Sequence, residues 1–244
     1  EELNLSDDSF RPFHAFPYTR REQREFSENT SLCRLWHAPH YNAPLKKGRA
    51  KLVVTVHDIM PMLFPSGSFN AKKGYAKKML TNAVIHADHI ITDSNNTKND
   101  IVQYLAAEPQ KITVIHLGVS KAFRHLRNSG SLFSDMRKKY GLPEKYYFYL
   151  GGITLHKNVL WLIQVFRELY RRKETQIPLL VVGQFNGNKK SDFYAKVINV
   201  FSKLTPKDGI YYVSRIQSQE DLVSIYNAAL ALVHPSLYEG FGLT

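Results

Sequence analysis

The sequence of 244 residues is poor in cysteine and contains no long apolar segment. Cys33 is the only cysteine, which excludes a disulfide framework and a cysteine-based metal site. No apolar run approaches the roughly 18 residues that a membrane-spanning helix needs. The start, Glu1-Glu2-Leu3-Asn4, is polar and acidic and predicts no signal peptide. Together these features predict a cytoplasmic protein.

Acidic side chains are scarce relative to basic ones. The chain has 33 Lys and Arg against 21 Asp and Glu, a net charge of +12 and a pI near 9.6. Such a charge attracts phosphate groups on nucleotides, anionic lipids or nucleic acids. We interpret it either as an ordinary solvated surface or as a face for an anionic membrane surface. No helix-turn-helix, zinc-finger or RNA-recognition motif supports nucleic acid as a specific partner.

Segments typical of strands and helices alternate along the chain. Strands are expected near residues 32–36, 51–56, 89–92, 111–115, 146–150, 178–183, 210–213 and 229–233. Amphipathic spacing and capping residues predict helices over 71–87, 94–106, 132–140, 159–172, 191–204 and 218–228. Residues 1–31 are polar and are expected to be irregular. The alternation predicts an α/β fold with parallel sheets, and a change in composition over 120–145 indicates a domain boundary.

Glycines and polar residues recur directly after the predicted strands. His57, Ser94, Gly118, Gly151-Gly152 and the stretch 235–242 all occupy such positions. Because the carboxyl ends of parallel strands share one edge of a sheet, these residues are expected at a ligand-binding edge. Two such units facing each other would form a cleft.

The segment after the strand at 146–150 suits phosphate binding. Gly151 and Gly152 allow backbone N–H groups to approach an anion, and Lys157 adds a full charge just before a helix begins. The order of residues is not that of a Walker A motif.

The last stretch places one carboxylate and two glycines after an apolar run. The run 229–233 predicts a buried strand, and Gly240 and Gly242 flank Phe241 directly after Glu239. Residues 235–243, Pro-Ser-Leu-Tyr-Glu-Gly-Phe-Gly-Leu, closely resemble the signature of family-4 retaining glycosyltransferases, which have the GT-B fold. The resemblance implies two Rossmann-like, doubly wound domains facing across a cleft.

Other segments carry the same resemblance. Gly151 to Asn158 is similar to the family's Gly-x-x-x-x-x-Lys-Asn element, although Gly152 stands where many members have Arg. Thr55 to Pro61 resembles the Thr-x-His-Asp-x-x-Pro motif, and His37 to Leu45 resembles the His-x-Pro-x-Tyr-x-x-Pro loop. The span of similarity, about Trp36 to Leu243, covers most of the chain.

The resemblance assigns roles to individual residues. Lys157, with the backbone of Gly151 and Gly152, would contact the donor diphosphate, and His57 would contact the reacting sugar. Glu239 would hold the donor sugar together with the backbone of Gly240, Phe241 and Gly242. Candidates for the acceptor side are His40, Tyr41 and Asp58. No Asp-x-Asp segment is present, so we expect no metal and no cofactor besides the donor.

The activity implied is transfer of a mannose-type sugar from a GDP- or UDP-sugar to a glycan or lipid-linked acceptor in cell-envelope polysaccharide or lipopolysaccharide synthesis. The enzyme would act in the cytoplasm or at the inner face of the membrane. The second acid of the family's Glu-x7-Glu motif would follow Thr244, and no glycine-rich opening precedes residue 32. We therefore expect an incomplete acceptor-side domain over residues 1–128 and an incomplete nucleotide-sugar domain over residues 129–244.

Three other interpretations remain open. The chain could be a catalytically inactive, nucleotide-sugar-binding remnant, a basic nucleic-acid-binding protein, or a related α/β enzyme that uses a sugar phosphate. The nucleotide, the sugar, the acceptor and the oligomeric state do not follow from the sequence.

Overall fold

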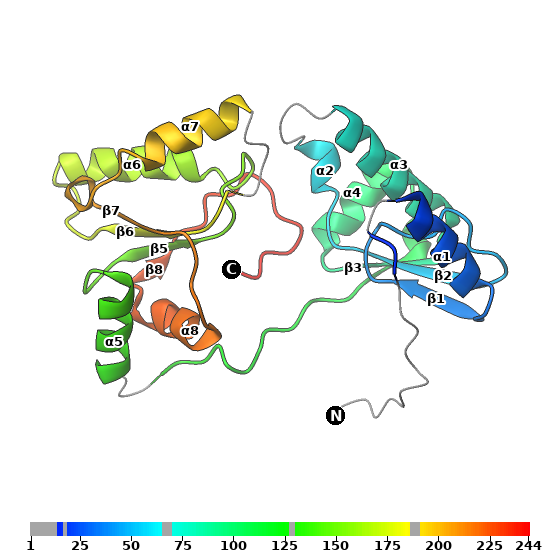
Figure 1. Ribbon diagram of the computed structural model, residues 1–244, viewed down its shortest axis with the longest axis horizontal. Helices are drawn as coiled ribbons and strands as arrows, with labels where there is room; N and C mark the ends of the chain where they lie inside the picture. The colour runs from blue at the N-terminus through cyan, green and yellow to red at the C-terminus, as the bar shows by residue number, and fades with distance from the viewer. Residues whose placement is uncertain (1–13, 17–18, 65–69, 127–129, 186–190) are drawn as a thin grey trace. The chain divides into compact units, whose positions relative to one another are not determined.

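A computed structural model describes residues 14–16, 19–64, 70–126, 130–185 and 191–244. The chain divides into two compact units: unit 1 comprises Glu1–Ile59 and Lys72–His116, and unit 2 comprises Met60–Ala71 and Leu117–Thr244. Each unit contains a four-stranded sheet in which every pairing is parallel (Figure 1). The predicted α/β fold with parallel sheets is confirmed. The predicted boundary at 128/129 lies outside the described residues and stays a prediction.

The sheet of unit 1 follows the order of the sequence. Its strands are β1 (Leu35–Ala38), β2 (Lys51–Val56), β3 (His89–Thr92) and β4 (Ile112–Val114), arranged as β1-β2-β3-β4. In β2, Leu52, Val54 and Val56 are fully buried, as expected for a central parallel strand. The segments after β1, β2 and β3 therefore emerge side by side at one edge of the sheet.

Helices connect β2 to β3 and β3 to β4 (Figure 1). After the short α2 (Met60–Leu63), helix α3 (Asn70–His86) buries Met79, Leu80, Ala83 and Val84, as their spacing predicts. Helix α4 (Asn95–Leu105) begins after Ser94, whose side chain accepts a hydrogen bond from the backbone N–H of Thr97. Ser94 is therefore the N-cap of α4. A 3-10 turn, η2 (Pro109–Lys111), leads into β4.

The prediction that residues 1–31 are irregular is wrong for α1 (Arg20–Thr30). Thr19 caps this helix by accepting a hydrogen bond from the N–H of Glu22 at 3.1 Å. The side chain facing inward is itself acidic: Glu22 is 4% exposed and accepts a hydrogen bond from Asn42 at 2.7 Å. Because a charged residue occupies the buried face, the segment shows no apolar stripe in the sequence.

In the sheet of unit 2, the side on which new strands are added changes part-way through the chain. Its strands are β5 (Tyr147–Leu150), β6 (Leu179–Val182), β7 (Ile210–Val213) and β8 (Ala231–Leu232), in the order β7-β6-β5-β8. The chain proceeds from β5 to β6 and β7 on one side. It then returns past β5 to place β8 on the other side. Strands β5 and β8 are thus neighbours at a topological switch point.

Helices cover both faces of this sheet (Figure 1). Helices α6 (Val159–Arg171) and α7 (Asp192–Phe201) pack on the face that carries Tyr149 and Val181. Helices α5 (Gly130–Tyr140) and α8 (Gln219–Ala228) pack on the face that carries Phe148 and Leu180. A 3-10 turn, η3 (Pro206–Asp208), precedes β7. Successive strand residues alternate between these two cores, as the pleat requires.

The expected buried strand over residues 229–233 is wrong in length and in burial. Strand β8 contains only Ala231 and Leu232, both exposed. In the described part of the chain it pairs with β5 alone, through Tyr147↔Ala231 and Phe148↔Leu232. One paired edge and one open edge explain why apolar residues here stay accessible.

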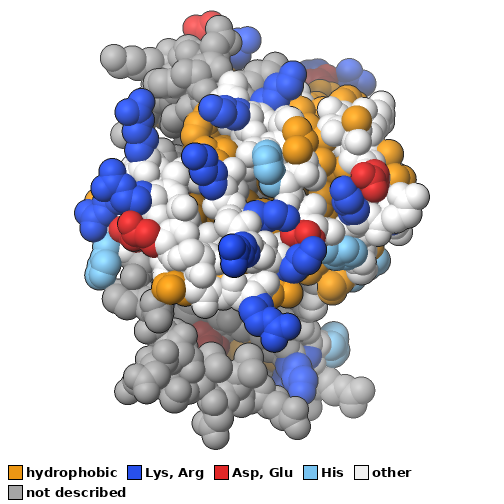
Figure 2. Space-filling model, turned by 90° about the vertical axis from the view of Figure 1, so that its right-hand side faces the viewer, with side chains coloured by type: hydrophobic (Ala, Val, Ile, Leu, Met, Phe, Trp, Pro, Cys, Tyr) orange, Lys and Arg blue, Asp and Glu red, His pale blue; other side chains and the backbone are white. Residues whose placement is uncertain are grey.

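No helix among the described residues is long and apolar enough to cross a membrane. Lys and Arg side chains are spread over the face seen in Figure 2, and acidic side chains are few on it. The excess of positive charge in the sequence is therefore displayed on the surface.

Candidate active site

Two loops of unit 2 meet where the carboxyl ends of β5 and β8 lie side by side. The first runs from Gly151 to Asn158 and ends at α6, and the second follows β8 from Val233 to Thr244. In open α/β sheets ligands bind at such a switch point, because the connections on either side diverge and leave a crevice. Predicted site residues from both loops fall at this position.

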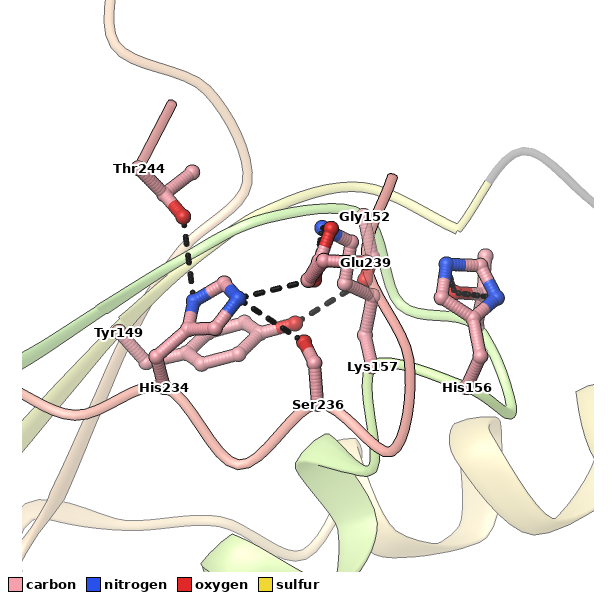
Figure 3. Close-up of polar contacts among 9 residues, drawn as sticks. Tyr149, Gly152, His156, Lys157, His234, Ser236, Glu239 and Thr244 are labelled. Carbon is pink, nitrogen blue, oxygen red and sulfur yellow. Dashed lines mark hydrogen bonds and ion pairs between the residues drawn. The ribbon is translucent and has the colours of Figure 1, made fainter. Parts of the chain in front are cut away.

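Lys157 and Glu239 form an ion pair across these two loops (Figure 3). The Nζ atom of Lys157 lies 2.7 Å from Oε1 and 3.0 Å from Oε2 of Glu239. Their side chains are only 18% and 24% exposed, so the pair is partly shielded from water. The structure thus brings together two residues that the sequence singled out in separate segments.

His234 holds the same carboxylate from a second direction. Its Nε2 atom lies 2.8 Å from Oε1 of Glu239, and its Nδ1 atom lies 3.1 Å from Oγ1 of Thr244 (Figure 3). The hydroxyl of Ser236 lies 3.1 Å from the same Nε2 atom. Neither His234 nor Ser236 was predicted. Ser236 lies within the 235–243 segment that resembles the family signature, and His234 directly precedes that segment.

The environment of Glu239 favours its ionised form. Partial burial opposes ionisation, but hydrogen bonds from Lys157, Ser236 and His234 outweigh it and lower the pKa of the carboxyl. The site therefore carries a carboxylate and an ammonium group in contact. A negatively charged ligand would find the positive group only by competing with Glu239.

The backbone of the glycine loop is tightly constrained. A Cβ on Gly183, at the end of β6, would lie 1.9 Å from the carbonyl oxygen of Gly151. The hydroxyl of buried Tyr149 donates to the carbonyl of Gly152 at 3.1 Å (Figure 3). Burial, with a contribution from the charge of Glu239, raises the pKa of Tyr149, so this hydroxyl stays a donor. The loop is therefore fixed before α6 begins.

The loop after Glu239 contains the remaining predicted donor residues, Gly240, Phe241 and Gly242. Gly242 has φ of 86°, in the left-handed region that favours glycine. On the other loop, Asn158 also has a left-handed conformation, with φ of 53°, immediately before α6. The first N–H groups of α6 and the Lys157 side chain thus lie at the same end of the helix, an arrangement suited to an anion.

A second group of predicted residues lies at the carboxyl edge of the sheet in unit 1. His57 follows β2, and its Nδ1 atom lies 2.7 Å from Oδ2 of Asp93, which follows β3. The rings of His40 and Tyr41, in the loop after β1, are in contact with their centroids 4.0 Å apart and their planes tilted by 36°. Asp58 follows His57 directly. Asp93 was not predicted as a site residue, although it comes directly after a predicted strand.

The surroundings of His40 favour its neutral form. The backbone N–H of Asn42 donates to its Nδ1 atom at 3.2 Å, so this nitrogen acts as an acceptor. Partial burial, together with the nearby His57, lowers the pKa of His40, despite opposing effects of Asp58 and Glu22. Within the described residues, no group of three or more His, Cys, Asp or Glu side chains is placed to hold a metal ion.

Family models match both halves of the chain. Residues 8–123 match the model described as Glycosyltransferase Family 4, and residues 133–244 match Glycosyl transferases group 1. The chain belongs to the family-4 glycosyltransferases of the GT-B fold, as its motifs predict.

The curated relatives that match the chain include O-antigen mannosyltransferases. The chain is 27% identical over 210 residues to O-antigen chain mannosyltransferase B of Escherichia coli, covering 86% of this chain and 52% of the relative. It is also 27% identical over 207 residues to O-antigen chain mannosyltransferase RfbU of Salmonella typhimurium, covering 84% and 50%. The chain therefore spans about half the length of these relatives.

Solved structures confirm the fold. Anabaena HepE in complex with UDP-glucose matches with a TM-score of 0.69 at 18% identity, covering 91% of this chain and 59% of that chain. Sucrose-phosphate synthase from Thermosynechococcus elongatus matches with a TM-score of 0.68 at 19% identity, covering 91% and 56%. At these identities the similarity establishes the GT-B architecture alone.

Proposed function

We propose that this protein transfers a mannose-type sugar, with retention at the anomeric carbon, from a nucleotide diphosphate sugar to a hydroxyl of a glycan or lipid-linked acceptor. The observation that carries the proposal is the contact of Lys157 with Glu239 at the β5/β8 switch point. One loop there offers positive charge and backbone N–H groups. The other offers a carboxylate beside glycine backbone. This combination suits a ligand with a diphosphate at one end and hydroxyls at the other.

In the proposed reaction the positive groups act on the leaving diphosphate. Lys157 and the N–H groups near Gly151 and Gly152 stabilise the negative charge that grows as the glycosidic bond breaks. Glu239 accepts hydrogen bonds from sugar hydroxyls, and the backbone of Gly240, Phe241 and Gly242 completes the sugar site. A diphosphate that draws Nζ of Lys157 toward itself would leave the carboxylate to the sugar.

Residues 129–244 are proposed as the donor domain and residues 1–128 as the acceptor domain. His57 would contact the reacting sugar, and His40, Tyr41 and Asp58 would serve the acceptor. The family resemblance favours a same-face mechanism in which the donor phosphate acts as the base. It also favours a reaction without a metal ion.

The donor and the cellular setting are proposed from the relatives. The names of the two O-antigen relatives support mannose-type transfer in cell-envelope polysaccharide synthesis, and the HepE complex supports a nucleotide diphosphate sugar as donor. GDP- and UDP-sugars are both candidates. The net charge of +12 favours association of the enzyme with an anionic membrane surface on the cytoplasmic side.

Thermal unfolding with excess GDP, UDP or ADP and their sugar conjugates tests the donor site. A ligand that binds only the folded state adds about 2.7 kcal/mol at a hundred times its Kd, so the midpoint should rise with one nucleotide. Lys157→Ala should abolish that rise. Lys138→Ala removes the same charge from an exposed position on α5 and should retain it. A rise that persists in Lys157→Ala, or no rise with any nucleotide, would contradict the proposal.

A further inference from the structure

The ring of His57 lies between two hydrogen-bond acceptors. Its Nδ1 atom is 2.7 Å from Oδ2 of Asp93, and its Nε2 atom is 3.1 Å from the carbonyl oxygen of Pro39. The three residues come from the ends of three adjacent strands of unit 1: Pro39 after β1, His57 after β2 and Asp93 after β3. The sheet itself therefore sets the spacing of this arrangement.

Burial differs sharply between the two ends of the ring. The side chain of Asp93 is 4% exposed, whereas that of His57 is 45% exposed. A buried carboxylate is costly unless a donor satisfies it, and His57 supplies one. The ring is thus anchored at its buried end and accessible at the other.

The chemistry of the partners fixes where the proton sits. An ionised carboxylate only accepts hydrogen bonds, so the 2.7 Å contact places a proton on Nδ1 of His57. A carbonyl oxygen also only accepts, so the Pro39 contact is a hydrogen bond only when Nε2 is protonated as well. In the neutral ring, Nε2 is instead an acceptor.

Hydrogen bonds also restrain the main chain of His57. The hydroxyl of Thr97, in the first turn of α4, donates to the carbonyl of His57 at 3.0 Å. Thr97 is fully buried, and its own N–H is bonded to Ser94, the residue after Asp93. One short segment, Asp93 to Thr97, therefore restrains both the main chain and the side chain of His57.

Other histidines of this sheet have different partners. His37 and His89 lie within strands, and their Nε2 atoms contact the hydroxyls of Thr55 and Thr113, each at 2.8 Å. A hydroxyl can donate or accept, so it leaves the tautomer of the ring open. The carboxylate partner of His57, by contrast, requires a proton on Nδ1 of that ring.

We propose that Asp93 is the positioning residue for His57, keeping its proton on Nδ1 and aiming Nε2 toward the accessible side, where a sugar hydroxyl can replace the Pro39 carbonyl. The identity of the hydroxyl rests on the proposed function, whereas the tautomer does not. In the neutral ring Nε2 accepts the hydroxyl proton in a hydrogen bond. The other titratable groups near the ring are His40, which is electrostatically coupled to His57, and the adjacent Asp58.

Nitrogen NMR on the whole chain with 15N-labelled histidine tests this directly. His57 signals are identified by their loss in His57→Gln, and spectra are recorded at a pH where the ring is neutral. The wild-type ring should be protonated at Nδ1. In Asp93→Asn that preference should be lost, because an amide can donate to Nδ1 as well as accept from it. The equivalent change in a serine protease triad disturbs the tautomer in this way.

A matched control separates the hydrogen bond from the general effect of charge. Asp58→Asn removes one negative charge beside His57 but leaves Asp93 in place, and it should keep the Nδ1–H tautomer. His89 serves as an internal reference whose signals should not change in either variant. A merely structural role for Asp93 would alter stability without changing the tautomer.

An Nε2–H tautomer in the wild-type protein would overturn the inference, and so would an unchanged tautomer in Asp93→Asn. If Asp93→Asn does not fold, the wild-type spectrum still decides. The measurement requires neither donor nor turnover. An Nδ1–H ring in a protein that binds no nucleotide would therefore reject the proposed function and leave this inference standing.

Discussion

The ammonium group of Lys157 contacts both carboxylate oxygens of Glu239, at 2.7 and 3.0 Å, across 82 positions of the sequence. Each residue belongs to a segment that would bind a different part of a nucleotide sugar. Their contact means that the positive charge of Lys157 and the negative charge of Glu239, proposed to bind phosphate and sugar, stabilise each other. Changing one of them should therefore alter what the other can bind.

Glu239→Gln should change the affinity for a nucleoside diphosphate and the affinity for its sugar conjugate differently. Losing the carboxylate releases Lys157 from its competitor, so binding of the nucleoside diphosphate alone should be retained or tightened. The sugar conjugate loses a charged hydrogen-bond acceptor, so its binding should weaken by about 10- to 150-fold, as expected for a charge-assisted hydrogen bond of about 1.5–3 kcal/mol. Calorimetric titration of both ligands measures the two effects.

Glu144→Gln is the matched control for that experiment. Glu144 is exposed in the same unit, and its substitution removes the same charge. It should leave both affinities unchanged. Parallel weakening of nucleotide and conjugate in Glu239→Gln would show that the carboxylate does not distinguish the sugar.

Acid should remove the stabilisation that Glu239 contributes. Its pKa is lowered in the folded chain, because hydrogen bonds from Lys157, Ser236 and His234 outweigh burial. A lowered pKa means that the contribution is present above the unfolded-state pKa, about 4.3, and is lost as the pH falls through the folded-state value. The difference in unfolding free energy between wild type and Glu239→Gln should therefore shrink between pH 5 and pH 3.

Urea unfolding of both proteins at intervals over this range measures the difference directly. Taking the difference cancels the titration of other carboxylates, such as Asp88, whose pKa is lowered mainly by Lys47. A difference that stays constant or grows toward pH 3 would mean that Glu239 titrates normally in the folded chain.

Gly183→Ala should destabilise unit 2 and displace the glycine loop. A Cβ at this position would lie 1.9 Å from the carbonyl oxygen of Gly151, and backbone atoms cannot rotate away as a side chain would. Overpacking typically costs about 1–3 kcal/mol, and a clash with backbone should reach at least the upper value. Denaturant unfolding measures the loss.

Gly130→Ala is the control for added volume. No atom lies within 4 Å of a Cβ built there, and the residue begins α5. Its stability should stay within about 1 kcal/mol of wild type, the typical difference between Gly and Ala in a helix. Equal stability of the two variants would show that β6 can shift away from Gly151 without cost.

The architecture could be predicted from the sequence because its signals are local. A β-branched run such as Lys51–Val56 can only be a buried strand, and Ser94 marks a helix start by its own hydrogen bond. The strand at 229–233 and the helix at Arg20–Thr30 were predicted wrongly for a different reason. Their burial depends on what packs beside them, and neither an open sheet edge nor the hydrogen bond of buried Glu22 to Asn42 leaves a local pattern.

Some residues of the candidate site could be predicted from local signals in the sequence, and others could not. Lys157 and Glu239 were predicted because each lies beside glycines after a strand, and the reversed strand order then brings them together. Asp93 and His234 were missed as site residues. Asp93 contacts the ring of His57, which is distant in sequence, and His234 contacts the carboxylate of nearby Glu239. These contacts can be seen only when side-chain positions are known.

The order of strands in unit 2 also links assembly of the sheet to assembly of the site. Strand β5 is the first strand of this unit and β8 the last, yet they are neighbours, so their pairing closes a long loop. A partly folded unit in which β8 has not joined β5 contains Lys157 without Glu239. If the proposed donor site is correct, it is complete only once the final strand has docked, and ligand binding then reports completed folding.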